Sequence, residues 1–285
     1  MQITLNDWLN EWLEVYVKPC KREKTYKCYY DAIKRIRKFC PEFLDKNVCQ
    51  IKEIEIQTFI NTLGANYAKS TINDIRVVFN QSFQIATRNQ YCSTNPIGHL
   101  SIPHEASEKN IRALTQAEQI KLEQAAKLDF LGHIVLFFLY TGLRSNELCN
   151  LKWEDYDKQN ELIRVVESKT KAGIRIVPLI PEASSIINSQ PHYNEYIFNS
   201  SRHTPVTESV LKRLYQRMRQ ATGIKIITNH VYRHSFATRL IEHGVDYKAL
   251  SALLGHTDVA FTLRQYTSVE NNFLKQQINL LHKNS

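Results

Sequence analysis

The segment His230-Val231-Tyr232-Arg233 begins a helical stretch and places an imidazole and a guanidinium one turn apart, on the same helical face. Upstream, Thr141-Gly142-Leu143-Arg144 follows an apolar run and supplies a second guanidinium. Downstream, Leu254-Gly255-His256 supplies a second imidazole, and Tyr266 follows ten residues later. These two arginines, two histidines and one tyrosine are side chains that can hold a phosphodiester and attack it with a phenol. No metal, nucleotide or protease motif competes for the same residues.

Size and charge set the first limits on function. The chain has 285 residues, an apolar share of 43% and a formal net charge of +9. Such a chain is expected to bury real cores, in two domains rather than one, and not to be disordered. The positive charge favours a polyanionic partner such as nucleic acid, although charge alone is weak evidence.

Cysteine usage and apolar runs indicate the compartment. The six cysteines form no C-x-x-C pair, which predicts reduced thiols in a cytosolic protein; they are Cys20, Cys28, Cys40, Cys49, Cys92 and Cys149. The first residues lack the basic and apolar regions of a signal peptide. The longest apolar run, at 134–140, is too short to cross a bilayer. We therefore expect a soluble, cytoplasmic protein without a membrane partner.

The first part of the chain has helical periodicity. Thr4-Leu5-Asn6-Asp7 is a helix-start signal, and apolar residues recur after it at spacings of three and four. Further helices are predicted at 25–40, 54–63 and 70–89, which together make a small bundle over residues 1–105. The flank of the second helix is strongly basic.

Periodicity stops at about 93–112, where proline, glycine and polar residues predict an interdomain linker. The second predicted domain, 106–285, has a capping box at Thr115-Gln116-Ala117-Glu118 and a nearly all-apolar central helix at about 131–140. Two β-branched runs predict a hairpin, and further helices follow; these segments are 162–166 and 174–179, then 208–221, 232–243, 247–254, 259–265 and an amphipathic tail at 269–282. The predicted fold is mainly α with a small β-hairpin or sheet (α+β).

Arg144 follows a glycine turn at the end of the central helix, where a rigid base can aim a long side chain. A guanidinium is always charged and presents planar, paired donors, so it suits the charge that develops on a reacting phosphodiester. Glu147 lies three residues on and can hold that guanidinium in place. The alternative is that Arg144 caps a helix and pairs with Glu147 at the surface.

His230 and Arg233 add an imidazole that titrates near neutral pH and a second guanidinium. The alternative is an ordinary polar helix N-terminus. His230 and His234 also have the i, i+4 spacing of a zinc-binding pair. The glutamate of H-E-x-x-H is missing, however, and Arg233 would repel a cation, so we predict no metal site and no cofactor.

His256 follows a glycine that ends the preceding helix, and Tyr266 falls at the far end of the next one. A phenol, with a pKa of about 10, needs a base or a cationic cluster to act as a nucleophile at neutral pH. The chain has fourteen tyrosines, and only the spacing from His256 singles out Tyr266. Tyr232 is expected to point away from the motif.

Lys169 and Lys171 lie in the turn of the predicted hairpin, and Arg175 lies on its second strand. A lysine at a hairpin tip can enter a DNA groove and protonate a leaving oxygen. The alternative is a solvated turn, in which lysines are common.

The order and spacing of these motifs resemble those of the tyrosine recombinase, or phage integrase, family. The resemblance spans about 114–266, and the matching segments are 141–148, 168–171 with 177–179, 230–238, and 253–258 leading to Tyr266. The N-terminal bundle resembles the family's core-binding domain more loosely. Many integrases carry a further N-terminal arm-binding domain. This sequence begins directly with the core-binding helices, either as a compact, Xer-type member or because an upstream segment is absent from it.

The resemblance implies roles for the phosphate-binding residues and the general acid. Arg144, Arg233 and His256 would bind the scissile phosphate. Lys169, or alternatively Lys171, would protonate the leaving 5′-oxygen.

The resemblance also implies the nucleophile and its base. Tyr266 would attack the phosphorus to give a 3′-phosphotyrosine and a free 5′-hydroxyl, and His230 would accept or relay the phenol proton. Because the covalent bond conserves energy, a second 5′-hydroxyl could reverse the step and join new partners without ATP or metal.

The implied partner is double-stranded DNA with inverted core sites, clamped by both domains largely through its phosphates. The basic side chains expected to contact DNA are Lys21, Arg22, Lys24, Lys27, Lys34, Arg35, Lys171 and Arg175. The tail at 269–282 would dock on a neighbouring protomer and build a homotetramer on DNA, unless it packs on its own domain. An accessory directionality factor is a further candidate partner, and a protein of this kind would associate with the nucleoid.

Two rival functions share these residues. A type IB topoisomerase uses the same phenol, arginines and 3′-linkage but relaxes supercoils as a monomer; the tail helix and the Gly-Leu-Arg motif favour recombination. A catalytically silent, sequence-specific DNA-binding regulator is the second rival. The presence of all five polar residues argues against it.

Overall fold

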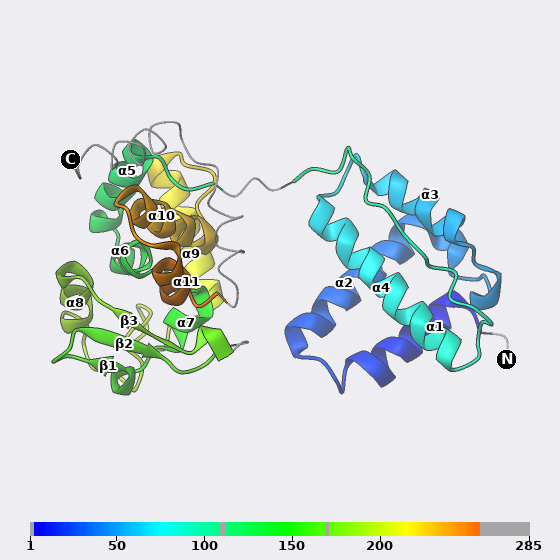
Figure 1. Cartoon of the computed structure of the whole chain (residues 1–285), viewed down its shortest axis with the longest axis horizontal. Helices are drawn as coiled ribbons and strands as arrows, with labels where there is room; N and C mark the ends of the chain where they lie inside the picture. Colours follow the sequence, from blue (N-terminus) through cyan, green and yellow to red (C-terminus); the bar gives the residue numbers. More distant parts are fainter. Residues whose placement is uncertain (1–2, 109–111, 169–170, 257–285) are drawn as a thin grey trace, which may run out of the picture. The chain divides into compact units, whose positions relative to one another are not determined.

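The computed structural model describes residues 3–108, 112–168 and 171–256. The chain divides into two compact units, residues 1–110 and 111–285, each of which has its own hydrophobic core (Figure 1).

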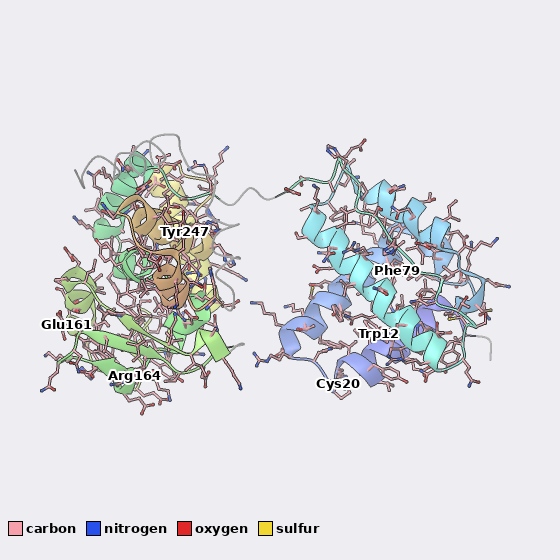
Figure 2. The ribbon with its side chains drawn as sticks, in the orientation of Figure 1. Trp12, Cys20, Phe79, Glu161, Arg164 and Tyr247 are labelled. Atoms are coloured by element: carbon pink, nitrogen blue, oxygen red, sulfur yellow. The ribbon has the colours of Figure 1, made fainter. Side chains whose placement is uncertain are left out.

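The first unit is helical. Its longer helices are α1 (Leu5–Trp12), which continues into a π-helical turn (Leu13–Val17), α2 (Glu23–Phe39), α3 (Glu53–Leu63) and α4 (Lys69–Arg88). The predicted start signal holds, because the Thr4 side chain accepts a hydrogen bond from the Asp7 backbone. Trp12 and Phe79 are among the side chains that fill the space between these helices (Figure 2).

Part of the segment predicted as a linker, 93–112, packs against the first unit. Ile97, Leu100 and Ala106 are buried in the core of the first unit. The side chain of Gln57 on α3 also accepts from the backbone N–H of Ser101 (2.7 Å) and donates to its carbonyl (3.0 Å). Proline and glycine end the helical periodicity here, but the scattered apolar residues of this irregular segment still pack against the helices of the first unit.

The second unit surrounds a buried helix. Its elements are α5 (Gln116–Leu128), α6 (Gly132–Thr141), α7 (Ser145–Cys149), β1 (Tyr156–Asp157), β2 (Leu162–Val165), β3 (Arg175–Pro178), α8 (Pro181–Asn188), α9 (Glu208–Thr222), α10 (Asn229–Glu242) and α11 (Tyr247–Leu254). Helix α6 lies at the centre and packs against α5, α8 and α10. The predicted capping box forms at Thr115 and Glu118.

The strands form one antiparallel sheet in the order β1-β2-β3. Ile163 pairs with Val177 in the β2–β3 register, and both side chains point into the core. The predicted mainly helical fold with a small sheet is therefore confirmed, while β1 and α8 were not predicted. The predicted helices at 259–265 and 269–282 lie outside the described residues.

All six cysteines are free thiols. Within the described ranges, none of the helices combines the length and the apolar character that a membrane span requires.

Candidate active site

A sharp turn between α6 and α7 positions Arg144. Gly142 ends α6 in the left-handed conformation, at φ +62°, and Arg144 then stands at the N-terminus of α7. A Cβ atom on Gly142 would lie 2.4 Å from Cδ1 of Phe236 on α10. Only glycine therefore meets both the backbone and the packing requirement at this turn.

Asn229, the first residue of α10, fixes this turn from the other side. Its Oδ1 accepts from the backbone N–H of Ser145 (3.1 Å), and its Nδ2 donates to the carbonyl of Leu143 (3.0 Å). The side chain is buried. Sequence reasoning missed this residue, and its place directly before His230 was the only available indication.

Arg233 lies on α10 and is 6% exposed. Its Nη1 donates to the carbonyl of Gly142 (2.8 Å), and its Nη2 donates to the carbonyl of Leu254. One guanidinium therefore joins the turn that carries Arg144 to the end of α11.

Glu147 is the acidic centre of the cluster, and its side chain is 1% exposed. It accepts from the backbone N–H of Arg144 (2.9 Å) and from Nη1 of the same residue (2.7 Å). The contact expected from their spacing is thus present. Burial alone would raise the pKa of Glu147, but the hydrogen bonds and charge of Arg175 and the hydrogen bonds from Arg144 outweigh it and lower the pKa.

Arg175, which was predicted to contact DNA, has its side chain buried and paired inside the second unit. Its side chain is 6% exposed, and its Nη2 lies 3.0 Å from Glu147 Oε2. It also donates from Nε to the carbonyl of Leu253 (2.6 Å) and from Nη1 to Glu147 Oε1 (3.1 Å) and the carbonyl of Gly173 (3.0 Å). The Arg175 guanidinium points into the unit from strand β3. Its N–H donors, which a contact with DNA would use, are therefore bonded to acceptors of the protein itself.

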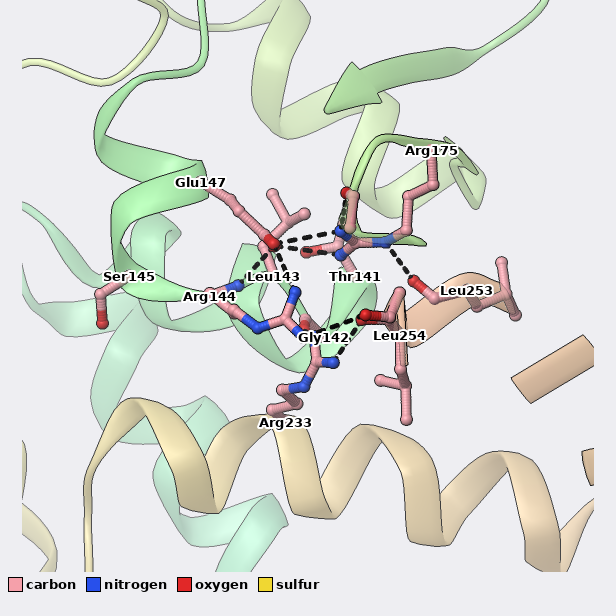
Figure 3. A network of polar contacts seen from close by, with 12 residues as sticks. Thr141, Gly142, Leu143, Arg144, Ser145, Glu147, Arg175, Arg233, Leu253 and Leu254 are labelled. Atoms are coloured by element: carbon pink, nitrogen blue, oxygen red, sulfur yellow. Dashed lines mark hydrogen bonds and ion pairs between the residues drawn. The ribbon is translucent and has the colours of Figure 1, made fainter. Parts of the chain in front are cut away.

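Three arginines thus meet at the C-terminus of α11, as Figure 3 shows for most of the network. Arg175, Arg233 and Arg144 donate to the successive carbonyls of Leu253, Leu254 and Gly255, the last over 3.2 Å. The final carbonyls of a helix lack partners within it and carry partial negative charge, which suits guanidinium groups.

His256 follows Gly255, the residue that ends α11. Its backbone N–H donates to the carbonyl of Ser251 (3.0 Å), and its side chain is half-buried. Burial, together with the charges of Arg233, Arg144 and Arg175 and of His234, lowers the pKa of His256 to about 4. The imidazole is therefore neutral at neutral pH.

Among the residues that the structure describes, three guanidiniums face one carboxylate in this cluster, so these groups together carry an excess of positive charge. Such a site suits an anion, and phosphate matches the planar donors of arginine. In the part of the chain that the structure describes, no three His, Cys, Asp or Glu side chains converge as a metal site would require.

The other predicted site residues are exposed or lie outside the described residues. His230 is exposed on the first turn of α10, and Lys171 is exposed in a short 3₁₀ turn (Lys171–Gly173) before β3. Lys169 and Tyr266 lie outside the described residues. Tyr232 is fully buried, as its expected direction away from the motif requires.

The basic flank of the first unit is at the surface. Lys21, Arg22, Lys24, Lys27 and Lys34 are exposed, and Arg35 is half-buried. The flank is therefore accessible.

Comparison with known proteins identifies both units. Residues 106–272 match the phage integrase family, and residues 4–64 match the N-terminal SAM-like domain of phage integrases. A tyrosine recombinase XerC-like protein of Caldanaerobacter subterraneus subsp. tengcongensis is 28% identical, over 94% of this chain and 80% of that protein. Tyrosine recombinase XerD of Pasteurella multocida is also 28% identical, over 78% of this chain and 80% of that protein.

Solved structures share the fold. A lambda integrase dimer bound to a COC′ core site has a TM-score of 0.77 and 26% identity, over 93% of this chain and 77% of that chain. The Tn1549 transposon integrase in complex with a circular intermediate DNA has a TM-score of 0.82 at 19% identity, over 98% of this chain and 99% of that chain. The motifs in their order, the shared fold and a family match over more than half of the sequence lead to one conclusion: this chain belongs to the phage integrase family.

Proposed function

We propose that this chain is a site-specific DNA recombinase that cleaves and rejoins strands through a 3′-phosphotyrosine, and so integrates or excises a mobile element. The observation that carries the proposal is the gathering of Arg144, Arg233 and His256 at the end of α11, in a cluster with excess positive charge. This is the charge pattern that a reacting phosphodiester requires.

Arg144 is the phosphate ligand that the geometry supports best. Its side chain is 34% exposed, although Arg175 beside it is buried. With the described residues, its guanidinium makes one hydrogen bond to Glu147 and one to the carbonyl of Gly255. A guanidinium has about five N–H donors, so several remain for non-bridging phosphate oxygens.

His256 would bind the same phosphate as a neutral group. A neutral imidazole carries one N–H donor, which can face a non-bridging oxygen. The negative charge of the phosphate would also raise the low pKa of His256.

The covalent step is proposed from the motif, because its nucleophile and general acid lie outside the described residues. The phenol oxygen of Tyr266 attacks the phosphorus, and the bond from phosphorus to the 5′-oxygen breaks. The phenol proton passes to His230, and Lys169, or alternatively Lys171, protonates the leaving oxygen. Attack by another 5′-hydroxyl reverses the step, so no energy source is needed.

We further propose that the partner is double-stranded DNA with inverted core sites. A homotetramer would form on it through the tail at 269–282, with an accessory directionality factor in addition, and the protein would associate with the nucleoid. The accessible basic flank on α2 and the likeness to a lambda integrase dimer bound to a core site support a DNA partner. The recombinase-like motifs around Arg144 favour this function over a type IB topoisomerase.

A nicked suicide duplex tests the proposal. Its core site is first selected from a random duplex library by binding to the full chain, and adduct formation is then read as an SDS-resistant protein–DNA band. We expect the wild-type chain to form the adduct without metal or ATP, and Tyr266→Phe to abolish it. Tyr247→Phe, which changes a tyrosine at the opposite end of α11, is the matched control and should keep it.

Two results would contradict the proposal. Tight binding without an adduct would leave a DNA-binding regulator. An adduct accompanied by plasmid relaxation, but by no strand exchange between two core sites, would indicate a topoisomerase.

A further inference from the structure

We infer that Arg175 is a positioning residue for DNA cleavage. It binds both carboxylate oxygens of Glu147, so that the guanidinium of Arg144 stays available to the phosphate. The inference rests on the proposed function, because it concerns the same phosphate site. It assigns Arg175 a task inside the protein instead of a contact with DNA.

Arg144 and Arg175 share the carboxylate of Glu147. A carboxylate has about four lone-pair positions. Glu147 accepts four hydrogen bonds: two from Arg144, through its backbone N–H and Nη1, and two from Arg175, through Nη1 and Nη2. The carboxylate is therefore saturated, and only one of its bonds comes from the Arg144 guanidinium.

The three side chains differ in burial. The side chains of Glu147 and Arg175 are 1% and 6% exposed, whereas that of Arg144 is 34% exposed. A buried carboxylate that loses one cation cannot be compensated by water, so it attracts the nearest remaining cation more strongly. In this cluster that cation is Arg144.

The consequence of losing Arg175 follows directly. Both carboxylate oxygens would become available to Arg144, and a guanidinium prefers to bind a carboxylate through two parallel N–H bonds. Arg144 would then turn its fork towards Glu147 and away from the phosphate. Cleavage would slow even though every phosphate-binding residue is still present.

Arg175 also lies between two segments that frame the site. It binds the carbonyl of Gly173, directly after the lysine-bearing turn, and the carbonyl of Leu253, near the end of α11 (Figure 3). A Cβ atom on Gly255 would lie 3.1 Å from its Cδ and from its Nη1. Arg175 thus joins the hairpin to the helix end that leads to His256.

The experiment is single-turnover cleavage of the suicide duplex by the full chain, with DNA affinity measured separately by gel shift. For Arg175→Gln we expect the cleavage rate to fall about 10- to 100-fold, since small misplacements of a catalytic group have effects of this size. Affinity should change by no more than about twofold. Arg175→Lys should recover part of the rate, because a lysine keeps the charge but not the fork.

The decisive variant removes both charges. In Glu147→Gln no carboxylate is left to capture Arg144, so adding Arg175→Gln to that variant should cost less than about threefold. A purely structural role predicts the same loss in both backgrounds. Arg164→Gln, on the adjacent strand and paired with Asp157 at the surface, is the matched control and should cleave within about twofold of wild type (Figure 2).

The outcomes separate this inference from the proposed function. The inference alone is overturned if Arg175→Gln cleaves as fast as the wild type. It is also overturned if Arg175→Gln lowers the cleavage rate equally in the wild-type and Glu147→Gln backgrounds. A wild-type chain that binds the site but forms no adduct overturns the proposed function and the inference with it. If thermal melting shows that Arg175→Gln is unfolded, Arg175→Lys replaces it in both backgrounds. The cleavage rate should then fall less than in Arg175→Gln, and again only when Glu147 is present.

Discussion

At the scale of single residues, Glu147 contributes most to the integrity of the cluster, because its buried carboxylate balances two guanidiniums. Replacing it with leucine would leave Arg175 buried without a counter-charge. We expect Glu147→Leu to lower the free energy of unfolding of the second unit by about 3 kcal/mol. Urea unfolding, read from hydrogen exchange of peptides in that unit, measures the change.

The control is Glu154→Gln, because the side chain of Glu154 is 77% exposed and its ion pair with Lys152 is long, at 3.8 Å. It should change the free energy of unfolding by less than about 0.5 kcal/mol. Similar effects of the two substitutions would mean that the buried ion pairs contribute little.

The pKa of His256 gives a second residue-level prediction. It is about 4 in the folded chain and about 6.5 for an unperturbed histidine, so the unfolded state takes up the proton first as the pH falls. Stability should therefore fall as the pH drops from about 6.5 to 4, and His133 and His234, whose pKa values are also lowered, act in the same direction.

His256→Asn should reduce this acid sensitivity. Between pH 7.5 and pH 5 it should lose less unfolding free energy than the wild type, by on the order of 1 kcal/mol, because the imidazole is only half-buried. Thermal melting at both pH values tests this. Parallel losses in the two proteins would show that His256 does not titrate in this window.

Spacing along the sequence predicts contacts within one helical turn and little beyond. Glu147 was paired correctly with Arg144, three residues away. The sequence analysis predicted a DNA contact for Arg175, because nothing in the sequence indicates its partners Glu147 and Leu253, which are 28 and 78 residues away. Asn229 was missed for the same reason, since its partners Leu143 and Ser145 lie more than eighty residues upstream.

At the scale of elements, two helix-ending glycines offer a controlled comparison. Gly142 and Gly223 both end helices in the left-handed conformation, at φ +62° and +72°. A Cβ on Gly142 would lie 2.4 Å from the ring of Phe236, whereas a Cβ on Gly223 would meet no atom of the described residues within 4 Å.

Alanine at these positions should therefore separate backbone strain from overpacking. Gly223→Ala should cost about 1 kcal/mol of unfolding free energy through its backbone alone. Gly142→Ala should cost about 3 kcal/mol, because overpacking adds to that strain. Urea unfolding gives both values, and equal costs would show that Phe236 moves aside freely.

Long periodic elements were predictable, and short ones were not. Helices α2, α4, α9 and α11 carry clear apolar stripes, and their bounds were predicted to within about two residues, which is the usual uncertainty of helix ends. Helix α7 has five residues and strand β1 has two, so neither spans enough turns or alternations to show a period. Tertiary contacts stabilise them instead.

At the scale of the whole molecule, the net charge of +9 predicts binding to DNA that weakens with salt. Lys27 and Lys34 are exposed on α2. Lys27→Gln and Lys34→Gln should each reduce the slope of log affinity against log salt concentration by about 0.9, if each lysine neutralises one phosphate. Lys46→Gln is the control, because Lys46 is already paired with Glu55.

Fluorescence anisotropy with the selected core duplex at several salt concentrations measures these slopes. Loss of affinity in both α2 variants without a change in slope would show that the helix does not contact phosphates.

The arginine cluster also determines when, during synthesis, the protein can become active. Arg144 and the carbonyl of Gly255 that it binds are 111 residues apart in the chain, whereas the core of the first unit is complete by Ala106. Because N-terminal domains fold first on the ribosome, a nascent chain holds a finished first unit long before its phosphate site can close. We expect stalled chains that end before Leu253 to resist protease over the first unit and to form no adduct. Translation itself would thus delay a DNA-cutting activity until the segment that carries Gly255 has been made.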